Sequence, residues 1–180
     1  MSKIPRERTI ILSQQIDQKA VNDVVKLIFD VNRSDEAKYK DYKKFKRKPI
    51  QLVLNTYGGI VYDGLAMINA IEASKTPVHV TALGSAMSMG LFILVSGHKR
   101  FINKNATVMY HQISSFSLGK IESLRNDIKE AERLEKICED ILFQKTKIKP
   151  KDLKPFKKRQ KEWYMDAKDA LKYGIVDKII

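Results

Sequence analysis

The sequence predicts a single α/β domain. Apolar runs of strand length alternate with segments in which apolar residues recur every three or four positions, as expected when helices pack on a sheet. Glycine-containing turns mark two of the junctions between strand and helix. The chain has 180 residues, 43% of them apolar, which suits one core, so we expect residues 1–180 to form one domain.

The first predicted elements are a strand and an amphipathic helix. Residues 9–12 are rich in β-branched side chains, which favours a strand. Asp17 is a suitable N-cap for the helix that follows. The apolar residues of this helix recur at helical spacing and are Val21, Val24, Val25, Leu27, Ile28 and Val31.

Two basic clusters contribute much of the net charge of +13. Residues 34–49 form the first, which we interpret as a basic insertion before the second strand, and residues 145–161 form the other. Such charge favours acidic or nucleic-acid partners. In both clusters, however, apolar or aromatic side chains recur at helical spacing, so we expect solvated helix faces rather than a nucleic-acid site.

The central part predicts strand, turn, helix and strand in succession. Residues 50–54 favour a buried strand, and the turn at 55–59 contains adjacent glycines that leave the backbone accessible. Residues 62–74 have a helical period, and residues 78–83 favour a second strand. This order is typical of α/β proteins.

A second glycine-containing turn is expected at residues 84–90. It includes Ser88 and leads into an apolar segment at 91–95, which has the length of a helix only if Ser88 begins it. Short strands are predicted at 100–102 and 107–110. His111 follows the second of these strands directly.

The C-terminal part begins with one long amphipathic helix, predicted over residues 120–147. Its apolar positions are Ile121, Leu124, Ile128, Ala131, Leu134, Ile137, Cys138 and Ile141. A strand at 163–165, a helix at 167–172 and a final strand at 175–176 are expected to complete the fold.

Several functional classes are disfavoured by composition. No apolar run reaches the roughly 18 residues that span a bilayer, and the N-terminus lacks a secretory signal, so we expect a cytoplasmic protein without membrane contact. Cys138 is the only cysteine, which excludes an internal disulfide and suggests a small core residue. The three histidines show no metal-ligand spacing, and no phosphate-binding loop is present.

Ser88 and His111 could form the reacting pair of a serine hydrolase. Such an enzyme needs an accessible hydroxyl, an imidazole that takes its proton, a carboxylate that orients the imidazole, and N–H donors for the oxyanion. Ser88 lies at a strand-to-helix turn, and His111 follows a strand that could end at the same sheet edge. Spacing alone leaves open that Ser88 is a helix N-cap and His111 a structural histidine.

Five segments, in order, resemble the proteolytic subunit of the Clp protease and its phage and plasmid relatives. Residues 7–12 resemble the family's opening strand, and residues 55–59 its Asn-Ser-Pro-Gly-Gly turn. Residues 84–90 match the nucleophile segment Gly-x-Ala-x-Ser-Met-Gly. Residues 109–112 are similar to the catalytic Met-Ile-His-Gln, and residues 173–177 to the closing Tyr-Gly-Leu-Val-Asp.

The resemblance implies a ClpP/crotonase-like fold of repeated β-β-α units, with 120–147 as the long handle helix between rings. It also implies a serine endopeptidase that cleaves peptides or unfolded proteins through an acyl-enzyme, without metal or organic cofactor. Ser88 would be the nucleophile and His111 the base, with the N–H groups of Gly59 and Met89 forming the oxyanion hole. The implied assembly is a homo-oligomer of heptameric rings, single or stacked in pairs.

The third member of the triad departs from the family pattern. Most of the family has Asp where this chain has Glu162, whose extra methylene can still reach the imidazole. Asp166 is the alternative, since it would lie on the same strand face if the run stays extended.

Two further departures concern partners. Few residues precede Arg8, and the stretch at 34–49 is expanded, which puts coupling to an unfoldase ATPase in doubt. The alternative functions are a catalytically inactive ClpP-like scaffold subunit and an acyl-CoA enzyme of the crotonase fold. A capsid-maturation role in a phage is compatible with the resemblance.

Overall fold

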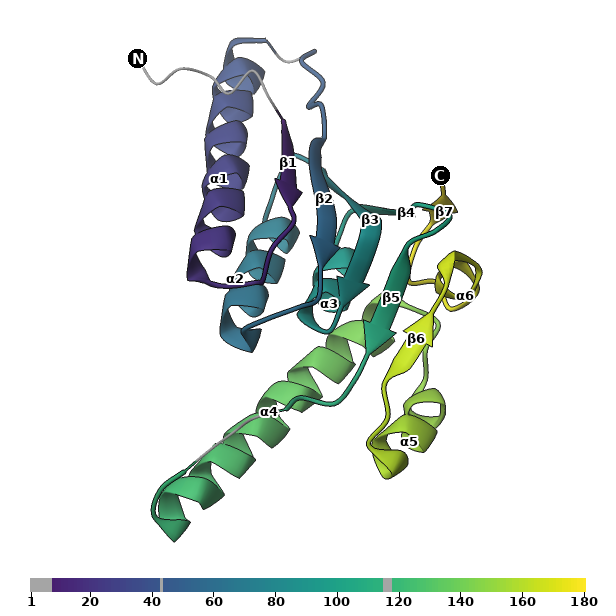
Figure 1. The fold of residues 1–180 in the computed structure, drawn as a ribbon. Helices are drawn as coiled ribbons and strands as arrows, with labels where there is room; N and C mark the ends of the chain where they lie inside the picture. Colours follow the sequence, from purple (N-terminus) through teal and green to yellow (C-terminus); the bar gives the residue numbers. More distant parts are fainter. Residues whose placement is uncertain (1–7, 43, 115–117) are drawn as a thin grey trace.

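The computed structural model describes residues 8–42, 44–114 and 118–180, and it contains a seven-stranded sheet with helices packed against it (Figure 1). The elements are β1 (Thr9–Leu12), α1 (Gln18–Asp41), β2 (Ile50–Thr56), α2 (Val61–Glu72), β3 (Val78–Met87), α3 (Met89–Val95), β4 (Lys99–Ile102), β5 (Thr107–Tyr110), α4 (Ile121–Lys145), α5 (Pro150–Arg159), β6 (Trp163–Met165), α6 (Ala167–Lys172) and β7 (Lys178–Ile179). The predicted α/β class is confirmed.

The sheet is mostly parallel. Its main order is β1-β2-β3-β4-β7, and all of these neighbours run parallel. The first part of β3 pairs with β4, whereas its last part pairs with β5, which in turn pairs with β6 in the antiparallel sense. The carboxyl ends of β3 and β5 therefore lie next to each other.

Most of the predicted elements are confirmed. β1, β5, β6 and α6 have the predicted bounds, and Asp17 caps α1 by accepting a hydrogen bond from the Ala20 N–H at 2.8 Å. The first part of the basic stretch at 34–49 is helical, because α1 continues through Asp41. Residue 43 of that stretch, and residues 1–7 before the first strand, lie outside the described residues.

The turn predicted at 84–90 is shorter than expected. Residues 84–87 belong to β3, which bulges there: Leu54 pairs with Ala82, but Thr56 pairs with Ala86. Pairing with β5 keeps this part of β3 extended, and that partner is distant in sequence. Only Ser88 separates β3 from α3.

The strand predicted at 175–176 is wrong. The N–H groups of Ile175 and Val176 both donate to the Ala170 carbonyl, so they close the C-terminal end of α6 and are not free for a ladder. The last strand is β7 (Lys178–Ile179). The long helix is confirmed with slightly narrower bounds, and α5 is a separate helix after it.

The core is apolar and continuous across the sheet. Leu52, Val80 and Leu91 are fully buried, and Cys138 packs in the same cluster. Burial, with the nearby Glu135 and Glu139, raises the pKa of the Cys138 thiol to about 11, so the thiol stays neutral. Cys138 is thus the core residue that the sequence predicts. Among the described helices, none has the length and apolarity needed to cross a bilayer.

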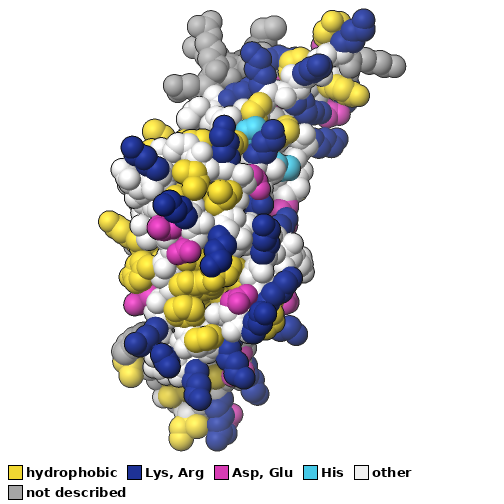
Figure 2. All heavy atoms as spheres, turned by 90° about the vertical axis from the view of Figure 1, so that its right-hand side faces the viewer, with side chains coloured by type: hydrophobic (Ala, Val, Ile, Leu, Met, Phe, Trp, Pro, Cys, Tyr) yellow, Lys and Arg dark blue, Asp and Glu magenta, His cyan; other side chains and the backbone are white. Residues whose placement is uncertain are grey.

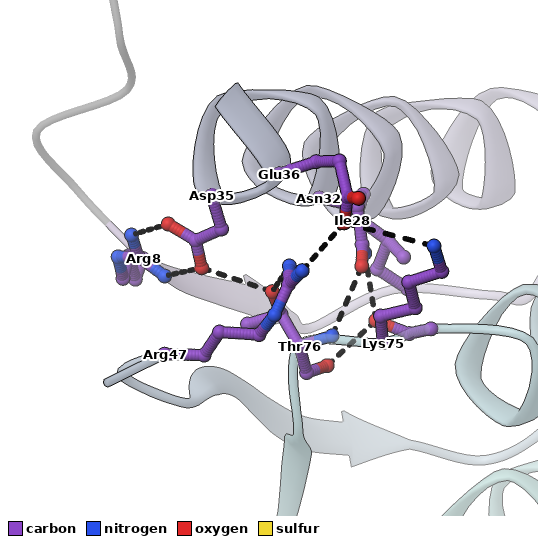
Figure 3. A network of polar contacts seen from close by, with 9 residues as sticks. Arg8, Ile28, Asn32, Asp35, Glu36, Arg47, Lys75 and Thr76 are labelled. Atoms are coloured by element: carbon purple, nitrogen blue, oxygen red, sulfur yellow. Dashed lines mark hydrogen bonds and ion pairs between the residues drawn. The ribbon is translucent and has the colours of Figure 1, made fainter. Parts of the chain in front are cut away.

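A polar network ties the beginning of β1 to α1 and to the loop before β3 (Figure 3). Arg8 donates two hydrogen bonds to the fully buried Asp35, at 2.6 and 2.8 Å, and Thr76 donates a third at 2.9 Å. Burial would raise the pKa of Asp35, but these hydrogen bonds and the charge of Arg8 outweigh it and lower the pKa.

Asp35→Asn should lower the free energy of unfolding by roughly 2 kcal/mol at neutral pH, because Arg8 loses a buried anionic partner. A carboxyl with a lowered folded-state pKa stabilises the fold above its unfolded pKa, and this contribution disappears as pH falls through the folded value. The difference in the free energy of unfolding between Asp35→Asn and the parent, measured by urea unfolding, should therefore become smaller in acid. Glu36→Gln, which removes a more exposed partner of Arg47, is the control and should change stability less.

Candidate active site

Ser88 occupies the strained junction between β3 and α3. Its φ of 52° and ψ of −123° are unusual for a residue with a side chain. The Ser88 N–H donates to the Met109 carbonyl of β5 at 2.9 Å, which fixes the junction against the neighbouring strand. The hydroxyl makes no capping hydrogen bond to α3, so the N-cap alternative does not describe its role.

The turn after β2 packs directly against Ser88. A Cβ atom on Gly58 would lie 2.6 Å from the Ser88 Cβ and 3.0 Å from the Met87 carbonyl oxygen, and Gly58 has a φ of 108°. Only glycine fits this position without a shift of the turn that contains Ser88. The importance of Gly58 was not predicted, although the adjacent glycines were its sequence signal.

Gly59 is fixed on its other side by the segment before α1. The Ile16 N–H donates to the Gly58 carbonyl at 2.9 Å, and the Ile60 N–H donates to the Ile16 carbonyl at 2.8 Å. These bonds use the groups of the flanking residues and leave the Gly59 N–H unused. Within the described ranges, neither the Gly59 N–H nor the Met89 N–H has a hydrogen-bond partner.

His111 follows β5 at the sheet edge where β3 ends. Met87 pairs with Met109, so the residues after the two strands leave the sheet at neighbouring positions. No hydrogen bond joins the Ser88 hydroxyl to the imidazole among the residues that the structure describes. Such bonds often tighten only when substrate is bound.

Glu162 and His111 lie just beyond the end of the antiparallel β5–β6 ladder. Tyr110 pairs with Trp163 in the last pair of this ladder, and His111 and Glu162 are the residues next to that pair. Both side chains line one cavity of about 330 Å³, which is also lined by Gln112, Ile113, Ser114, Gln160 and Lys161. Glu162 is exposed and forms no ion pair in the described part of the chain.

Asp166 lies at the other end of β6. It is the N-cap of α6, where its Oδ1 accepts a hydrogen bond from the Asp169 N–H at 2.8 Å. Met165, the residue before Asp166, pairs with Val108 in the middle of β5. The fold thus brings Glu162 to His111 and gives Asp166 a capping role.

The other two histidines lie elsewhere. His98 Nδ1 accepts a hydrogen bond from the Val78 N–H at 3.1 Å, at the beginning of β3. His79 is part of β3, and burial, with the charges of Lys99 and His98, lowers its pKa. Over the described ranges, no three His, Cys, Asp or Glu side chains gather in a metal-binding arrangement.

A polar cluster that joins the two neighbours of His111 to α4 and α5 was not predicted from the sequence. The neighbours of His111 both contact α4: the Tyr110 hydroxyl donates to Glu139 at 3.1 Å, and Gln112 Nε2 donates to Glu135 at 3.2 Å. Lys157 of α5 bridges the two glutamates, at 2.6 and 2.9 Å. This cluster joins β5, α4 and α5, and its sequence signal is a pair of acidic residues beside Cys138 on the buried side of α4.

Comparison with known proteins decides the family. A sequence model of the Clp protease family matches residues 1–180. The chain belongs to the Clp protease family. It is similar to the ATP-dependent Clp protease proteolytic subunit of Deinococcus radiodurans, with 28% identity over 183 residues that cover 99% of this chain and 83% of the relative. The chain is therefore a Clp-type protease, and its α/β architecture is that of the ClpP fold.

Gly58→Ala should lower both stability and peptide hydrolysis, because the added Cβ meets Ser88 and the backbone has a positive φ. We expect a loss of about 1–3 kcal/mol in urea unfolding. The loss of stability caused by Gly58→Ala should be smaller in a Ser88→Gly protein, which lacks the Cβ atom that would clash. A cost that is identical in both backgrounds would contradict the packing of this turn on Ser88.

Proposed function

We propose that the chain is a serine endopeptidase in which Ser88 is the nucleophile, His111 the general base and Glu162 the residue that orients His111. The observation that carries the proposal is the strand register: Ser88 and His111 directly follow the paired ends of β3 and β5, and Glu162 directly precedes β6, next to the Tyr110–Trp163 pair that ends the β5–β6 ladder. The cavity lined by His111 and Glu162 supplies space for a substrate chain at this edge.

In the acylation step, His111 takes the proton of the Ser88 hydroxyl as its oxygen attacks the scissile carbonyl carbon. The carbonyl oxygen becomes an oxyanion, and the unused N–H groups of Gly59 and Met89 are its proposed donors. Collapse of the intermediate breaks the C–N bond, and the imidazolium gives its proton to the leaving amine. Water then hydrolyses the acyl-enzyme by the same steps, and no cofactor takes part.

Two observations favour this chemistry over the alternatives. The Ser88 hydroxyl does not cap α3, and Ser88 is in a strained conformation of the kind found at functional turns. An acyl-CoA enzyme of the crotonase fold would need the oxyanion donors but not a serine next to a histidine and a carboxylate. An inactive scaffold would need none of them.

The proposal is tested by incubating the protein with an unfolded, fluorescently labelled protein and with acyl-CoA thioesters. We expect peptides to be released from the unfolded protein and the thioesters to remain unchanged. Turnover of the thioesters without peptide release would support an acyl-CoA enzyme of the crotonase fold. No turnover of either substrate would support a catalytically inactive scaffold subunit.

We also propose that α4 forms an interface between subunits, in heptameric rings. Figure 1 shows the N-terminal half of α4 extending beyond the sheet. Ile121 is 69% exposed and Ile128 is 58% exposed in this half, whereas Leu134 in the other half is buried. An apolar stripe that leaves the core in this way is typical of a contact with another chain.

Ile128→Asp should reduce the oligomer to smaller species while the subunits remain folded, because a carboxylate would be buried in the contact. Sedimentation at micromolar concentration measures the assembly, and circular dichroism checks the fold. Ile11→Asp changes a residue on β1 that is 62% exposed and serves as the control, with no change of assembly expected. A parent protein that sediments as a monomer would contradict the interface.

A further inference from the structure

α5 exposes a row of lysines on one side of the helix. Lys151, Lys154 and Lys158 are all exposed, and their spacing places them on one helical face. None of them forms an ion pair within the described part of the chain. The one acidic residue of α5, Asp152, is occupied at the helix N-terminus, where it accepts a hydrogen bond from the Lys149 N–H at 2.8 Å.

The opposite face of α5 fixes the helix to the body of the protein. Leu153 is buried, and the Phe156 ring stacks on Trp163 with 4.8 Å between centroids and 9° between planes. Lys157 forms ion pairs with two glutamates of α4. These contacts fix the rotation of α5 about its axis. The three lysines on the opposite face therefore point to solvent.

The row leads directly to the active-site cavity. α5 ends at Arg159, and Gln160 turns the chain with a left-handed conformation. Gln160, Lys161 and Glu162 then line the cavity together with His111. Figure 2 views the side of the molecule that bears α5, β6 and α6 in Figure 1, and Lys and Arg side chains outnumber Asp and Glu side chains on this face.

We propose that the outer face of α5, with Lys151, Lys154 and Lys158, binds acidic residues of the substrate polypeptide on one side of the scissile bond. This inference rests on the proposed peptidase function. Inside the cavity the charges of Lys161 and Glu162 oppose each other, so the unpaired lysines of α5 set the sign of the potential beside it. A substrate segment rich in Asp and Glu would be attracted to this side of the site.

The surface fits an acidic polypeptide better than a nucleic acid. Single-stranded nucleic acids are usually bound by cations together with exposed aromatic side chains on which bases stack. The aromatic residue of α5, Phe156, is stacked against Trp163 on the inner face instead. The lysine row also ends beside the cavity lined by His111 and Glu162, so one polypeptide could contact both places.

The test measures binding to the Ser88→Ala protein, which holds peptides without turning them over. Fluorescence anisotropy compares a peptide whose flanking residues are Glu with an isosteric peptide whose flanking residues are Gln. A second protein carries Lys151→Gln, Lys154→Gln and Lys158→Gln. The matched control carries Lys40→Gln, Lys44→Gln and Lys46→Gln, which remove exposed cations from the last turn of α1 and the segment after it. The end of α1 lies at the other end of the molecule from α5 in Figure 1.

We expect the acidic peptide to bind roughly tenfold more tightly than the Gln peptide at low ionic strength, with the difference shrinking as salt is added. The α5 variant should lose this preference, and the α1 variant should keep it. Equal binding of the two peptides, an equal loss in both variants, or binding of single-stranded DNA in place of the acidic peptide would overturn the inference.

Cleavage of the Gln peptide by the parent protein separates the two proposals. If the parent cleaves the Gln peptide and shows no preference for the acidic peptide, the proposed role of α5 in substrate binding is wrong, while the peptidase assignment stands. If the acidic peptide binds through α5 but the parent cleaves neither peptide, the surface stands and the peptidase assignment fails.

Discussion

Ser88→Ala and His111→Ala should each lower peptide hydrolysis by about a thousandfold or more, with the fold and the oligomer unchanged. Without the hydroxyl no acyl-enzyme forms, and without the imidazole nothing takes the proton from that hydroxyl. Because the two residues act as a unit, the double variant should be little worse than either single variant. Initial rates of cleavage, with sedimentation of each variant, measure both expectations.

The matched control for these variants is Ser114→Ala. Ser114 lines the same cavity as His111 and is exposed, so its removal changes a serine at the site without touching the proposed chemistry. Its turnover should stay within a few-fold of the parent. Near-normal turnover by Ser88→Ala would end the serine-protease proposal.

Glu162→Gln should lower turnover by two or more orders of magnitude while the protein keeps its fold. An amide can stabilise the wrong tautomer of His111 and cannot balance the imidazolium charge that develops during attack. The loss should appear in kcat more than in KM, since the carboxylate acts mainly in the transition state. Steady-state kinetics across neutral pH measure this split.

Two companion variants sharpen the assignment. Glu162→Asp restores the residue that most of the family has at the matching position, and it should retain far more activity than Glu162→Gln. Asp166→Asn should have little effect, because Asn also caps helices well and Asp166 lies at the other end of β6. Equal activity of Glu162→Gln and the parent would remove Glu162 from the mechanism, and a large loss in Asp166→Asn would favour Asp166.

The elements that local sequence determines were predicted well. β5 and β6 have the predicted bounds, because each is a short apolar run with clear breaks at both ends. Asp17 caps α1 as its residue type and position indicate. The end of β3 was not predicted, since its last residues are kept extended by β5, and a partner so distant in sequence leaves no local signal.

The arrangement of residues around the site could not be predicted, because it depends on contacts between segments that are far apart in the sequence. The choice between Glu162 and Asp166 was open from the sequence, and only the fold shows that Glu162 shares a cavity with His111 while Asp166 is the N-cap of α6. The contact of Gly58 with Ser88 joins two turns from different strands, so it could be recognised only in the fold. The same holds for Lys157, whose partners are on another helix.

The most direct test of Ser88 as an activated nucleophile is intact-mass analysis after treatment with a fluorophosphonate. This reagent reacts with a serine whose hydroxyl is activated by a neighbouring base. The parent protein should gain the mass of one adduct, located on the peptide that contains Ser88, and both Ser88→Ala and His111→Ala should gain none. An unmodified parent, or an adduct that persists in Ser88→Ala, would contradict the assignment.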